Sequence, residues 1–321
     1  MKFKYTQIND IHGSSTVSDS NKESVYGDST FFELFFDANE NQLLHYYEPE
    51  LGLFVVESPM VIERALMAGY QPAAFVMIDN IADEMCRRFS ELAEQANQTN
   101  QSNQANQKEQ SEQPEHSEQS EQAALYDDTP IPVYVADYET IAGLTGVNIT
   151  RGVLAMMKRR PLPDMAELIR DYHRIAIFDD VENPTNVGAM FRSAAALGIE
   201  AVILTGSSSD PLYRRASRVS VGTVFQVPWT KLGKKENNYI DTLHKLGFKT
   251  AAMALSDNSV SIRDERLKNE ERLAIIMGNE GFGLSDEVIE SSDYVVKIPM
   301  KNNVDSLNVA AASSIVFWEL A

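Results

Sequence analysis

Apolar residues gather along the chain either in short runs or in longer stretches where they recur every three or four positions. Short runs predict buried strands, and the periodic stretches predict helices. In the first half, strands are predicted at 51–58, 73–79 and 131–137, and helices at 59–70 and 138–146. This alternation predicts a small α/β domain over residues 28–160.

The same alternation is clearer in the second half. The predicted strands are 174–180, 200–206, 223–229, 248–255, 273–279 and 294–300, and the predicted helices are 186–198, 236–247 and 307–320. These strands are continuous runs rich in Ile, Val and Leu, without a polar face. Such strands are typical of a parallel sheet that is covered on both faces. Residues 165–321 are therefore expected to form a second α/β domain.

Two polar segments interrupt the pattern. Residues 92–122 consist almost purely of Gln, Asn, Ser and Glu. They cannot bury enough apolar surface to offset their ordering entropy, so we expect a disordered, low-complexity insertion in the first domain. Residues 1–27 are also polar and are expected to be loosely ordered.

Length and composition agree with two globular domains, since the chain has 321 residues of which 43% are hydrophobic. The one cysteine, Cys86, excludes an intramolecular disulfide or a Cys-based zinc site, and no metal is expected. No apolar stretch follows the first lysines, and no run approaches the length of a membrane span. A cytoplasmic protein without a membrane partner is the expectation.

Charge is distributed unevenly around a net value of -19. Residues 1–150 hold 7 Lys and Arg against 25 Asp and Glu, whereas residues 151–321 hold 21 against 22. Basic clusters occur at 158–160 and 214–215. Because a nucleic acid needs a local basic face, the net charge leaves an RNA partner possible without supporting it.

The first candidate functional loop is "NPTNVGAMFRSAAALG", residues 183–198, which follows a predicted strand. Thr185 or Asn186 is expected to cap the helix, and Gly188 permits a close backbone approach. Asn186 and Arg192, six positions apart, can address one ligand from the capping turn and the flank of the helix. The alternative is that Arg192 pairs with a nearby carboxylate: Asp179, Asp180 or Glu182.

The second loop is "MGNEGFGLSDE", residues 277–287, whose glycines lie between a strand and a helix that Ser285 can cap. Its G-x-x-G-x-G spacing is neither the dinucleotide fingerprint nor a P-loop. Glu280, between Gly278 and Gly281, would repel a phosphate, so a nucleoside or a cationic ligand is favoured. The alternative is a plain turn.

The third loop is "IPMKNNVDSLNVAAASS", residues 298–314. Its small apolar residues predict a closely packed helix, at whose start lie the polar Ser306 and Asn308. The alternative here is simple helix capping.

Taken together, "NPTNVGAMFRSAAALG", "IMGNEGFGL" and "IPMKNNVDSLNVAAA" resemble the three motifs of the SpoU/TrmH class of SPOUT RNA methyltransferases. The resemblance spans residues 173–321 and includes "YRRASRVSVGTVFQVPW" at 213–229. Residues 50–160 are weakly similar to the ribosomal-protein-like RNA-binding domain that precedes many members. Asp305 stands where a glutamate is more usual, and the acidic N-terminal half is atypical of an RNA-binding arm.

The resemblance implies a C-terminal domain that is threaded into a trefoil knot, a topology that general folding rules call exceptional. It also implies a homodimer that binds S-adenosylmethionine (SAM) and methylates a ribose 2′-hydroxyl in structured rRNA or tRNA, although knotted relatives also methylate bases. The cofactor would be held largely by backbone groups of five residues: Thr205, Gly206, Gly278, Ile298 and Leu307.

Roles for side chains follow from the same resemblance. Arg192 would lie beside the target ribose and its phosphate. The pocket around Arg192 would be shaped by Asn186, Glu280, Ser306 and Asn308. Arg215 and Arg218 would contact RNA, and Phe317 and Trp318 are expected at the dimer interface.

Two other classes of function are alternatives to this hypothesis. The first is an RNA-binding or ribosome-assembly protein that retains the SAM pocket with little catalysis. Methyl transfer that depends on Arg192 would separate it from an enzyme. The second, a nicotinamide-dependent oxidoreductase, is disfavoured by the spacing of the glycines.

Overall fold

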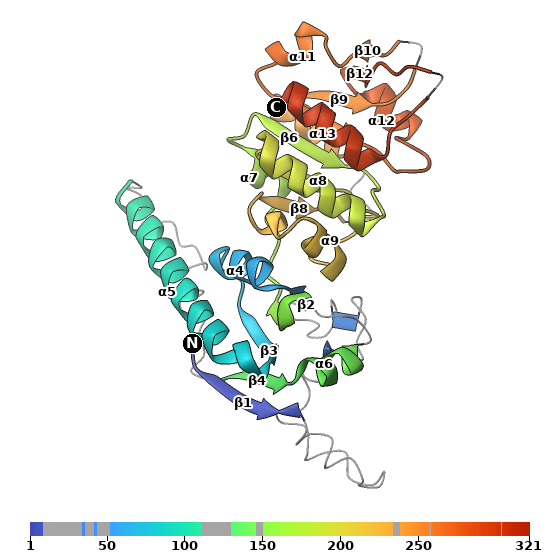
Figure 1. Cartoon of the computed structure of the whole chain (residues 1–321). Helices are drawn as coiled ribbons and strands as arrows, with labels where there is room; N and C mark the ends of the chain where they lie inside the picture. Colours follow the sequence, from blue (N-terminus) through green and yellow to red (C-terminus); the bar gives the residue numbers. More distant parts are fainter. Residues whose placement is uncertain are drawn as a thin grey trace, which may run out of the picture. The chain divides into compact units, whose positions relative to one another are not determined.

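A computed structural model describes residues 1–8, 34–35, 42–43, 52–110, 130–145, 150–233, 238–256, 258–302 and 304–321. The chain divides into two compact units, Met1–Arg160 and Pro161–Ala321. Figure 1 traces the elements of both units.

Unit 1 is built on a five-stranded sheet in the order β1-β4-β3-β5-β2. Its strands are β1 Phe3–Gln7, β2 Leu53–Glu57, β3 Pro72–Ile78, β4 Ile131–Ala136 and β5 Val153–Lys158. Its helices are α4 Pro59–Met67, α5 Asp79–Gln110 and α6 Tyr138–Thr145, with a 3-10 turn η2 at Thr150–Gly152. Strands β1, β4 and β3 are parallel, whereas β5 pairs antiparallel with β3 and β2. The sheet is therefore mixed.

The first residues of the chain are a strand, so the prediction of a loosely ordered N-terminus is wrong for residues 3–7. Phe3 and Tyr5 alternate with polar residues, and β1 pairs in register with β4. The ring of Phe3 meets Phe75 edge-on, with 6.1 Å between ring centroids. This period-two pattern was too short to stand out beside the polar residues that follow. Residues 9–27 lie outside the described part of the chain.

The prediction of disorder at 92–122 is wrong for residues 92–110, which continue helix α5. The first half of α5 buries a stripe of apolar side chains, namely Ala82, Met85, Phe89 and Ala93. Once such packing has nucleated a helix, each further residue adds one backbone hydrogen bond. Gln, Glu and Ala are good helix formers, so the helix continues into the polar tract. Residues 111–122 lie outside the described residues.

Unit 2 is built on a seven-stranded sheet in the order β10-β12-β9-β11-β6-β7-β8, in which every pairing is parallel. Its strands are β6 Arg174–Phe178, β7 Ala201–Leu204, β8 Trp229–Lys231, β9 Lys249–Met253, β10 Val260–Ser261, β11 Leu273–Met277 and β12 Tyr294–Lys297. Its helices are α7 Met165–Ile169, α8 Pro184–Leu197, α9 Arg214–Val219, α10 Tyr239–Lys245, α11 Glu265–Asn269, α12 Asp286–Ser291 and α13 Val309–Leu320. The predicted parallel α/β sheet is confirmed.

Helices cover both faces of this sheet. On one face α8 lies beside α13 (Figure 1), and the Phe191 ring of α8 meets Phe178 of β6 edge-on at 5.5 Å. On the other face, Ile169 of α7 and Leu243 of α10 are buried against Ile177 and its neighbours in the sheet. The central strands β6, β7 and β11 therefore bury side chains on both sides, which explains their continuous apolar runs.

The segment 223–229, predicted as a strand, is instead a 3-10 turn η3 at Thr223–Phe225 that leads into β8. The hydroxyls of Ser220 and Thr223 donate to backbone carbonyls three residues earlier in the chain, at 2.8 and 3.0 Å. Such local side-chain bonds close turns in competition with sheet pairing. The apolar composition of the segment reflects burial in this turn.

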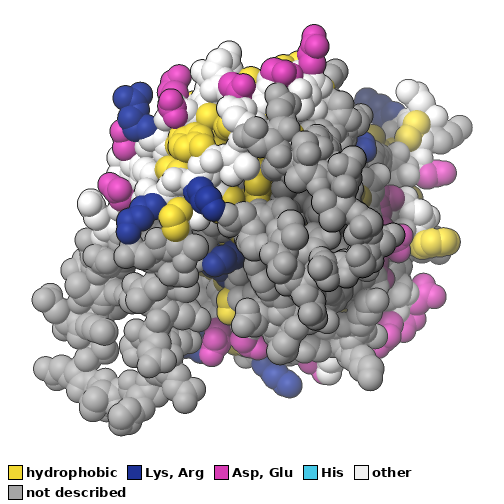
Figure 2. Space-filling view, turned by 90° about the horizontal axis from the view of Figure 1, so that it is seen from below, with side chains coloured by type: hydrophobic (Ala, Val, Ile, Leu, Met, Phe, Trp, Pro, Cys, Tyr) yellow, Lys and Arg dark blue, Asp and Glu magenta, His cyan; other side chains and the backbone are white. Residues whose placement is uncertain are grey.

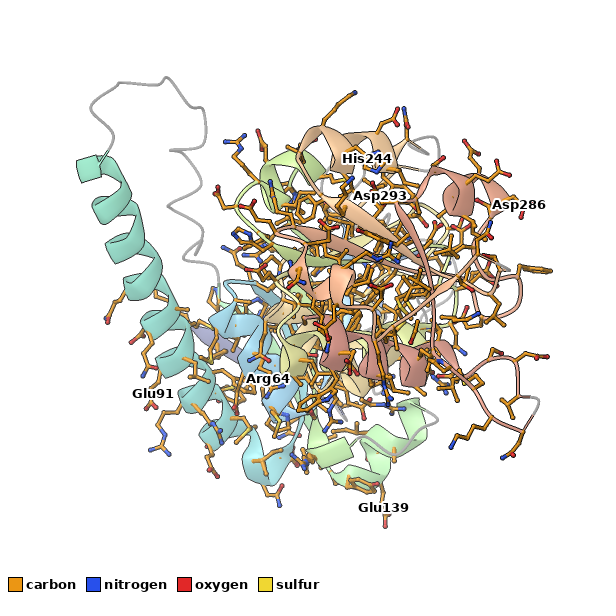
Figure 3. All side chains as sticks on the ribbon, turned by 90° about the horizontal axis from the view of Figure 1, so that it is seen from above. Arg64, Glu91, Glu139, His244, Asp286 and Asp293 are labelled. Carbon is orange, nitrogen blue, oxygen red and sulfur yellow. The ribbon has the colours of Figure 1, made fainter. Side chains whose placement is uncertain are left out.

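At the edge of the sheet where the strands begin, polar side chains form hydrogen bonds that hold neighbouring segments together. Asp293, just before β12, accepts hydrogen bonds from Lys249 Nζ at 2.7 Å and Thr250 N at 2.9 Å, both at the start of β9. Its Oδ2 also lies 3.0 Å from His244 Nε2 (Figure 3). Arg272 donates to four backbone carbonyls at the same edge. Ligand binding is therefore expected at the opposite edge, where the strands end.

Among the described residues, the structure contains no helix that is both long and apolar enough to cross a membrane.

Candidate functional site

The three loops singled out in the sequence all follow strands of the same parallel sheet. They leave β6, β11 and β12, and the loop that begins at Thr205 leaves β7. Because parallel strands end at one edge, all four loops emerge on the same side of unit 2.

The cap of α8 lies earlier in the first loop than Thr185 or Asn186, so the prediction of either residue as the cap is wrong. Asn183 is the cap, and its side-chain oxygen accepts from Thr185 N at 2.9 Å. Pro184 occupies the first helical position, where its missing N–H does no harm, so the residue before it is the natural cap. The sequence Asn183-Pro184 therefore indicates that Asn183 is the cap. Asn186 is thereby left with a side chain available for other contacts.

Gly188 brings α8 and α9 into close contact. A Cβ atom at this position would lie 2.4 Å from the backbone oxygen of Ala216. In the next helix, Arg215 Nε donates to Thr185 Oγ1 at 2.6 Å. Arg215 and Arg218 are both exposed on α9. The contact through Thr185 places Arg215 beside the first turn of α8.

The glycine-rich loop is a closed turn held by Asn279. The backbone groups of Asn279 and Gly283 bond each other in both directions at 3.1 Å. The Asn279 side-chain oxygen accepts from Gly281 N at 2.8 Å and Phe282 N at 3.1 Å, while its nitrogen donates to Asp180 O at 2.8 Å. Asn279 thus fixes the loop and ties it to the end of β6. No pattern in the sequence indicates this role of Asn279.

Glycine is required at two positions of this turn. A Cβ on Gly278 would lie 2.7–2.8 Å from backbone atoms of Gly283, and Gly283 itself has a φ of 72°. The turn therefore packs tightly against the end of β11. The predicted cap of α12 is confirmed, since Ser285 Oγ accepts from Val288 N at 3.3 Å.

A line of hydrogen bonds joins the three loops. Glu280 Oε1 accepts from Asn186 Nδ2 at 2.8 Å and from Asn183 N at 3.2 Å. Asn186 Oδ1 in turn accepts from Asn308 Nδ2 at 3.2 Å. Asn308 also caps α13, because its oxygen accepts from Ala310 N at 3.0 Å. The side chain of Asn308 thus both caps α13 and contacts the site, two roles that the sequence left as alternatives.

Arg192 is exposed on α8, two turns from the cap. Within the described part of the chain it makes no hydrogen bond or ion pair, so pairing with Asp179, Asp180 or Glu182 is not what holds it. Asp179 instead accepts from Tyr239 OH at 3.1 Å, and Asp180 from Thr205 Oγ1 at 2.9 Å. The guanidinium of Arg192 is available to a ligand.

Carboxylates gather at the same edge of the sheet. Asp179 and Asp180 directly follow β6. Burial of Asp179, together with the charge of Asp180, raises the pKa of the Asp179 carboxyl above its ordinary value. Glu280 adds a third carboxylate nearby. This cluster disfavours a di- or triphosphate and favours a cationic ligand.

The five residues expected to hold a cofactor all lie on loops at the ends of strands or just before α13. Gly278 and Ile298 directly follow β11 and β12, and Thr205 directly follows β7. Thr205 is only 8% exposed, and its hydroxyl braces the turn after β6 by accepting from Asp180 N at 2.9 Å. Gly206 is half-buried, and Leu307 is 39% exposed.

Ser306 and Phe317 differ from the other predicted residues. Ser306 is exposed and makes no hydrogen bond within the described residues. Phe317, expected at a dimer interface, is fully buried in its own unit, so that expectation is wrong for Phe317. Trp318, the next residue of α13, is 75% exposed.

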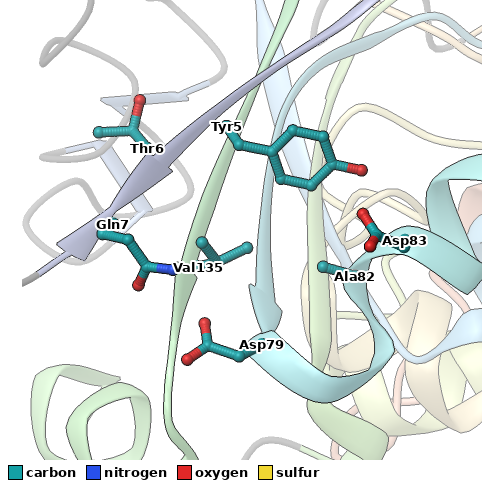
Figure 4. A pocket seen from close by; sticks show the side chains of 7 residues that line it. All are labelled: Tyr5, Thr6, Gln7, Asp79, Ala82, Asp83 and Val135. Atoms are coloured by element: carbon teal, nitrogen blue, oxygen red, sulfur yellow. The ribbon is translucent and has the colours of Figure 1, made fainter.

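Unit 1 contains a separate pocket of about 420 Å³ between β1 and the start of α5 (Figure 4). Tyr5 and Gln7 line one side, and Asp79 and Asp83 line the other. On the face shown in Figure 2, the described Lys and Arg side chains are scattered among Asp and Glu. The two pocket carboxylates do not favour a phosphate group.

Comparison with known proteins gives a family match to unit 2. Residues 173–318 match the model of the SpoU rRNA Methylase family. A protein of Mycobacterium bovis named as an uncharacterized tRNA/rRNA methyltransferase is 36% identical over 189 residues, which cover 59% of this chain and 65% of that protein. The match thus spans just under two thirds of that relative's length. The 23S rRNA (guanosine(2553)-2′-O)-methyltransferase RlmP of Bacillus subtilis is 26% identical over 193 residues, covering 60% and 74%.

Solved structures share the fold at lower identity. One is the AdoMet-bound rRNA methyltransferase of Sinorhizobium meliloti, with a TM-score of 0.62 and 22% identity over 84% of this chain and 86% of that one. Another is the SpoU methyltransferase AviRb of Streptomyces viridochromogenes in complex with AdoMet, with a TM-score of 0.61 and 17% identity over 91% and 96%.

Proposed function

We propose that this protein belongs to the SpoU rRNA methylase family, whose model matches residues 173–318, and that it is a SAM-dependent methyltransferase acting on a ribose 2′-hydroxyl of rRNA or tRNA. The observation that carries the proposal is the hydrogen-bonded line of Glu280, Asn186 and Asn308, with Arg192, which bonds no other described residue, on the same helix as Asn186. Three loops far apart in the sequence converge on one polar site. RlmP, named for 2′-O-methylation, supports the choice of ribose over base.

The residues of the site fit SAM, which is both a nucleoside and a cation. The carboxylates of Asp179, Asp180 and Glu280 favour the positive sulfonium. Gly278 packs against the backbone of Gly283 at the end of β11, and its own main-chain groups would meet the adenosine. The half-buried Ile298 and Gly206 would complete the cofactor loops with Leu307. When bound, SAM supplies an electrophilic methyl group, and the two relatives solved with AdoMet support this assignment.

Arg192 would position the substrate. Its planar guanidinium suits bidentate binding of the phosphate beside the target ribose. Because a guanidinium stays charged near neutral pH, we assign it to orientation of the ribose hydroxyl, whose proton would leave towards water. Positioning alone is worth roughly 7–11 kcal/mol in favourable intramolecular models. Asn186, Glu280 and Asn308 would hold the surrounding wall, with Ser306 at its rim.

Three further features belong to the same proposal. Residues 28–160 would hold structured RNA, aided by Arg215 and Arg218 of unit 2, and residues 165–321 would form the knotted catalytic domain. The chain would act as a homodimer. The dimer is supported by the outward face of α13, where Ile315 is 41% and Trp318 75% exposed.

Transfer of labelled methyl groups tests the reaction. The protein and methyl-labelled SAM are incubated with total RNA from cells that lack the gene, and the RNA is digested to nucleosides. A labelled 2′-O-methyl nucleoside is the expected product. A labelled base would show that the target of methylation is a base and not a ribose. The absence of transfer, with SAM binding intact, would favour the assembly-factor alternative.

A further inference from the structure

Phe282 is the most exposed of the large apolar side chains among the described residues, at 96% of its full surface. It lies in the glycine-rich loop, two residues after Glu280, so its Cα is within about 7 Å of the Cα of Glu280. Glu280 is bonded directly to Asn186 of the candidate site. Phe282 therefore belongs to the loop that supplies Glu280 to the site, and its ring is exposed.

The backbone beneath this ring is fixed. Asn279 accepts a hydrogen bond from Phe282 N at 3.1 Å and closes the turn through Gly283. Leu284, two residues later, is 7% exposed and anchors the loop in the apolar core. The core therefore does not need Phe282, and the turn presents the ring to solvent in a constant place.

We propose that Phe282 is a stacking platform for an unpaired RNA base next to the ribose that is methylated, an inference that rests on the proposed function. RNA is recognised in sequence-specific complexes largely by splaying out bases that stack on aromatic side chains. A base turned out of its helix near the target loses its stacking partners, and a rigid aromatic ring replaces one of them. Every base has a π-face, so the ring would accept any base.

The neighbouring charges agree with an RNA occupant. Arg192 and Arg215 are exposed cations on α8 and α9, the helix that carries Asn186 and the helix packed against it, and both are suited to RNA phosphates. The Glu280 carboxylate beside the ring is engaged by two N–H donors. These bonds hold the carboxylate in the wall of the site.

Three substitutions separate stacking from other roles of the ring. Phe282→Leu keeps a large apolar side chain without a π-face, Phe282→Trp enlarges the π-face, and Phe282→Ala removes the side chain. Removal of a base-stacking aromatic weakens RNA binding by about 5- to 150-fold. We expect Phe282→Leu and Phe282→Ala to raise the half-saturating RNA concentration in methyl transfer by such a factor. The maximal rate should change less, SAM affinity should be unchanged, and Phe282→Trp should match the wild type.

A second measurement is independent of methyl transfer. A single-stranded RNA of about 20 nucleotides carrying 2-aminopurine reports stacking through quenching of its fluorescence. If the wild type quenches the fluorescence and Phe282→Leu does not, the stacking proposal is supported. This holds even if the wild type transfers no methyl group, because an absence of transfer would count against the proposed function alone. If Phe282→Leu equals the wild type in both measurements, stacking is refuted. Stacking is also refuted if light scattering shows that Phe282→Leu dissociates a dimer, since the ring would then pack against a second copy of the chain.

Discussion

Replacement of Asn186 by aspartate tests the line of hydrogen bonds at its centre. In the native protein, Asn186 Nδ2 donates to Glu280 Oε1 at 2.8 Å, and Asn186 Oδ1 accepts from Asn308 Nδ2 at 3.2 Å. Asn186→Asp keeps the shape and the second bond but sets an oxygen against the Glu280 carboxylate. A hydrogen bond to a charged group, worth roughly 1.5–3 kcal/mol, is thus replaced by repulsion.

The repulsion depends on pH. Two unit charges 4 Å apart repel by roughly 4 kcal/mol at an effective dielectric constant of about 20. The folded protein relieves this by retaining one proton between the two carboxyls, so the pKa of the introduced carboxyl rises above its ordinary value of about 4. The unfolded chain binds no such proton above that value. The loss of stability is therefore small near about pH 4.5 and grows as the pH rises towards about pH 7–8.

Unfolding followed in urea between pH 4.5 and 8 measures this difference, with Asn186→Ala as the matched control. The alanine variant loses the same hydrogen bond without adding a charge, so its deficit relative to the wild type should hardly vary with pH. The aspartate variant should approach the wild type at the acidic end and fall below the alanine variant at pH 8. If the aspartate variant follows the alanine variant at every pH, Glu280 does not face Asn186 as described.

Three further predictions concern packing, assembly and acid stability. Gly188→Ala should destabilise unit 2 by roughly 1–3 kcal/mol in urea unfolding, because its Cβ meets the Ala216 oxygen at 2.4 Å; an unchanged midpoint would contradict that contact. Trp318→Asp should convert a dimer into a 35.9 kDa monomer in light scattering, whereas a wild type that is already monomeric would disprove the proposed interface. Although burial raises the pKa of Asp293, the hydrogen bond from Lys249 and others lower it to about 2. Asp293→Asn should therefore lower stability by about 1–2 kcal/mol at pH 6, after allowance for solvent screening, and the deficit should vanish as the pH falls from about 4 to 2.

The sequence predicted the parallel sheet of unit 2 because its central strands β6, β7 and β11 are buried on both faces and read as continuous apolar runs. Prediction from the sequence was wrong where local hydrogen bonds or helix packing favoured a structure other than the one that the residue composition indicates. At 223–229 the hydroxyls of Ser220 and Thr223 close a turn in a segment rich in β-branched and aromatic residues. At 92–110 a packed helix extends into a polar tract whose composition alone indicates disorder.

The candidate site, too, was predicted only in part from the sequence. Motif spacing singled out Asn186, Glu280 and Asn308, but it could not show that they bond to one another, because that contact depends on how the three loops converge. Asn279 was missed because its role is to bind backbone groups of its own loop, which leaves no mark on charge or periodicity. Phe282 reads in the sequence as an ordinary apolar residue between glycines, because the sequence does not show that its side chain is exposed.

Methyl transfer by Arg192→Ala tests the central claim most directly. Labelled SAM and RNA are supplied as above, SAM binding is measured on the same preparation, and Arg170→Ala, at an exposed arginine before β6, serves as the control. The account predicts that Arg192→Ala binds SAM as the wild type does but loses methyl transfer, while Arg170→Ala retains both. Turnover by Arg192→Ala comparable to that of the wild type would contradict it.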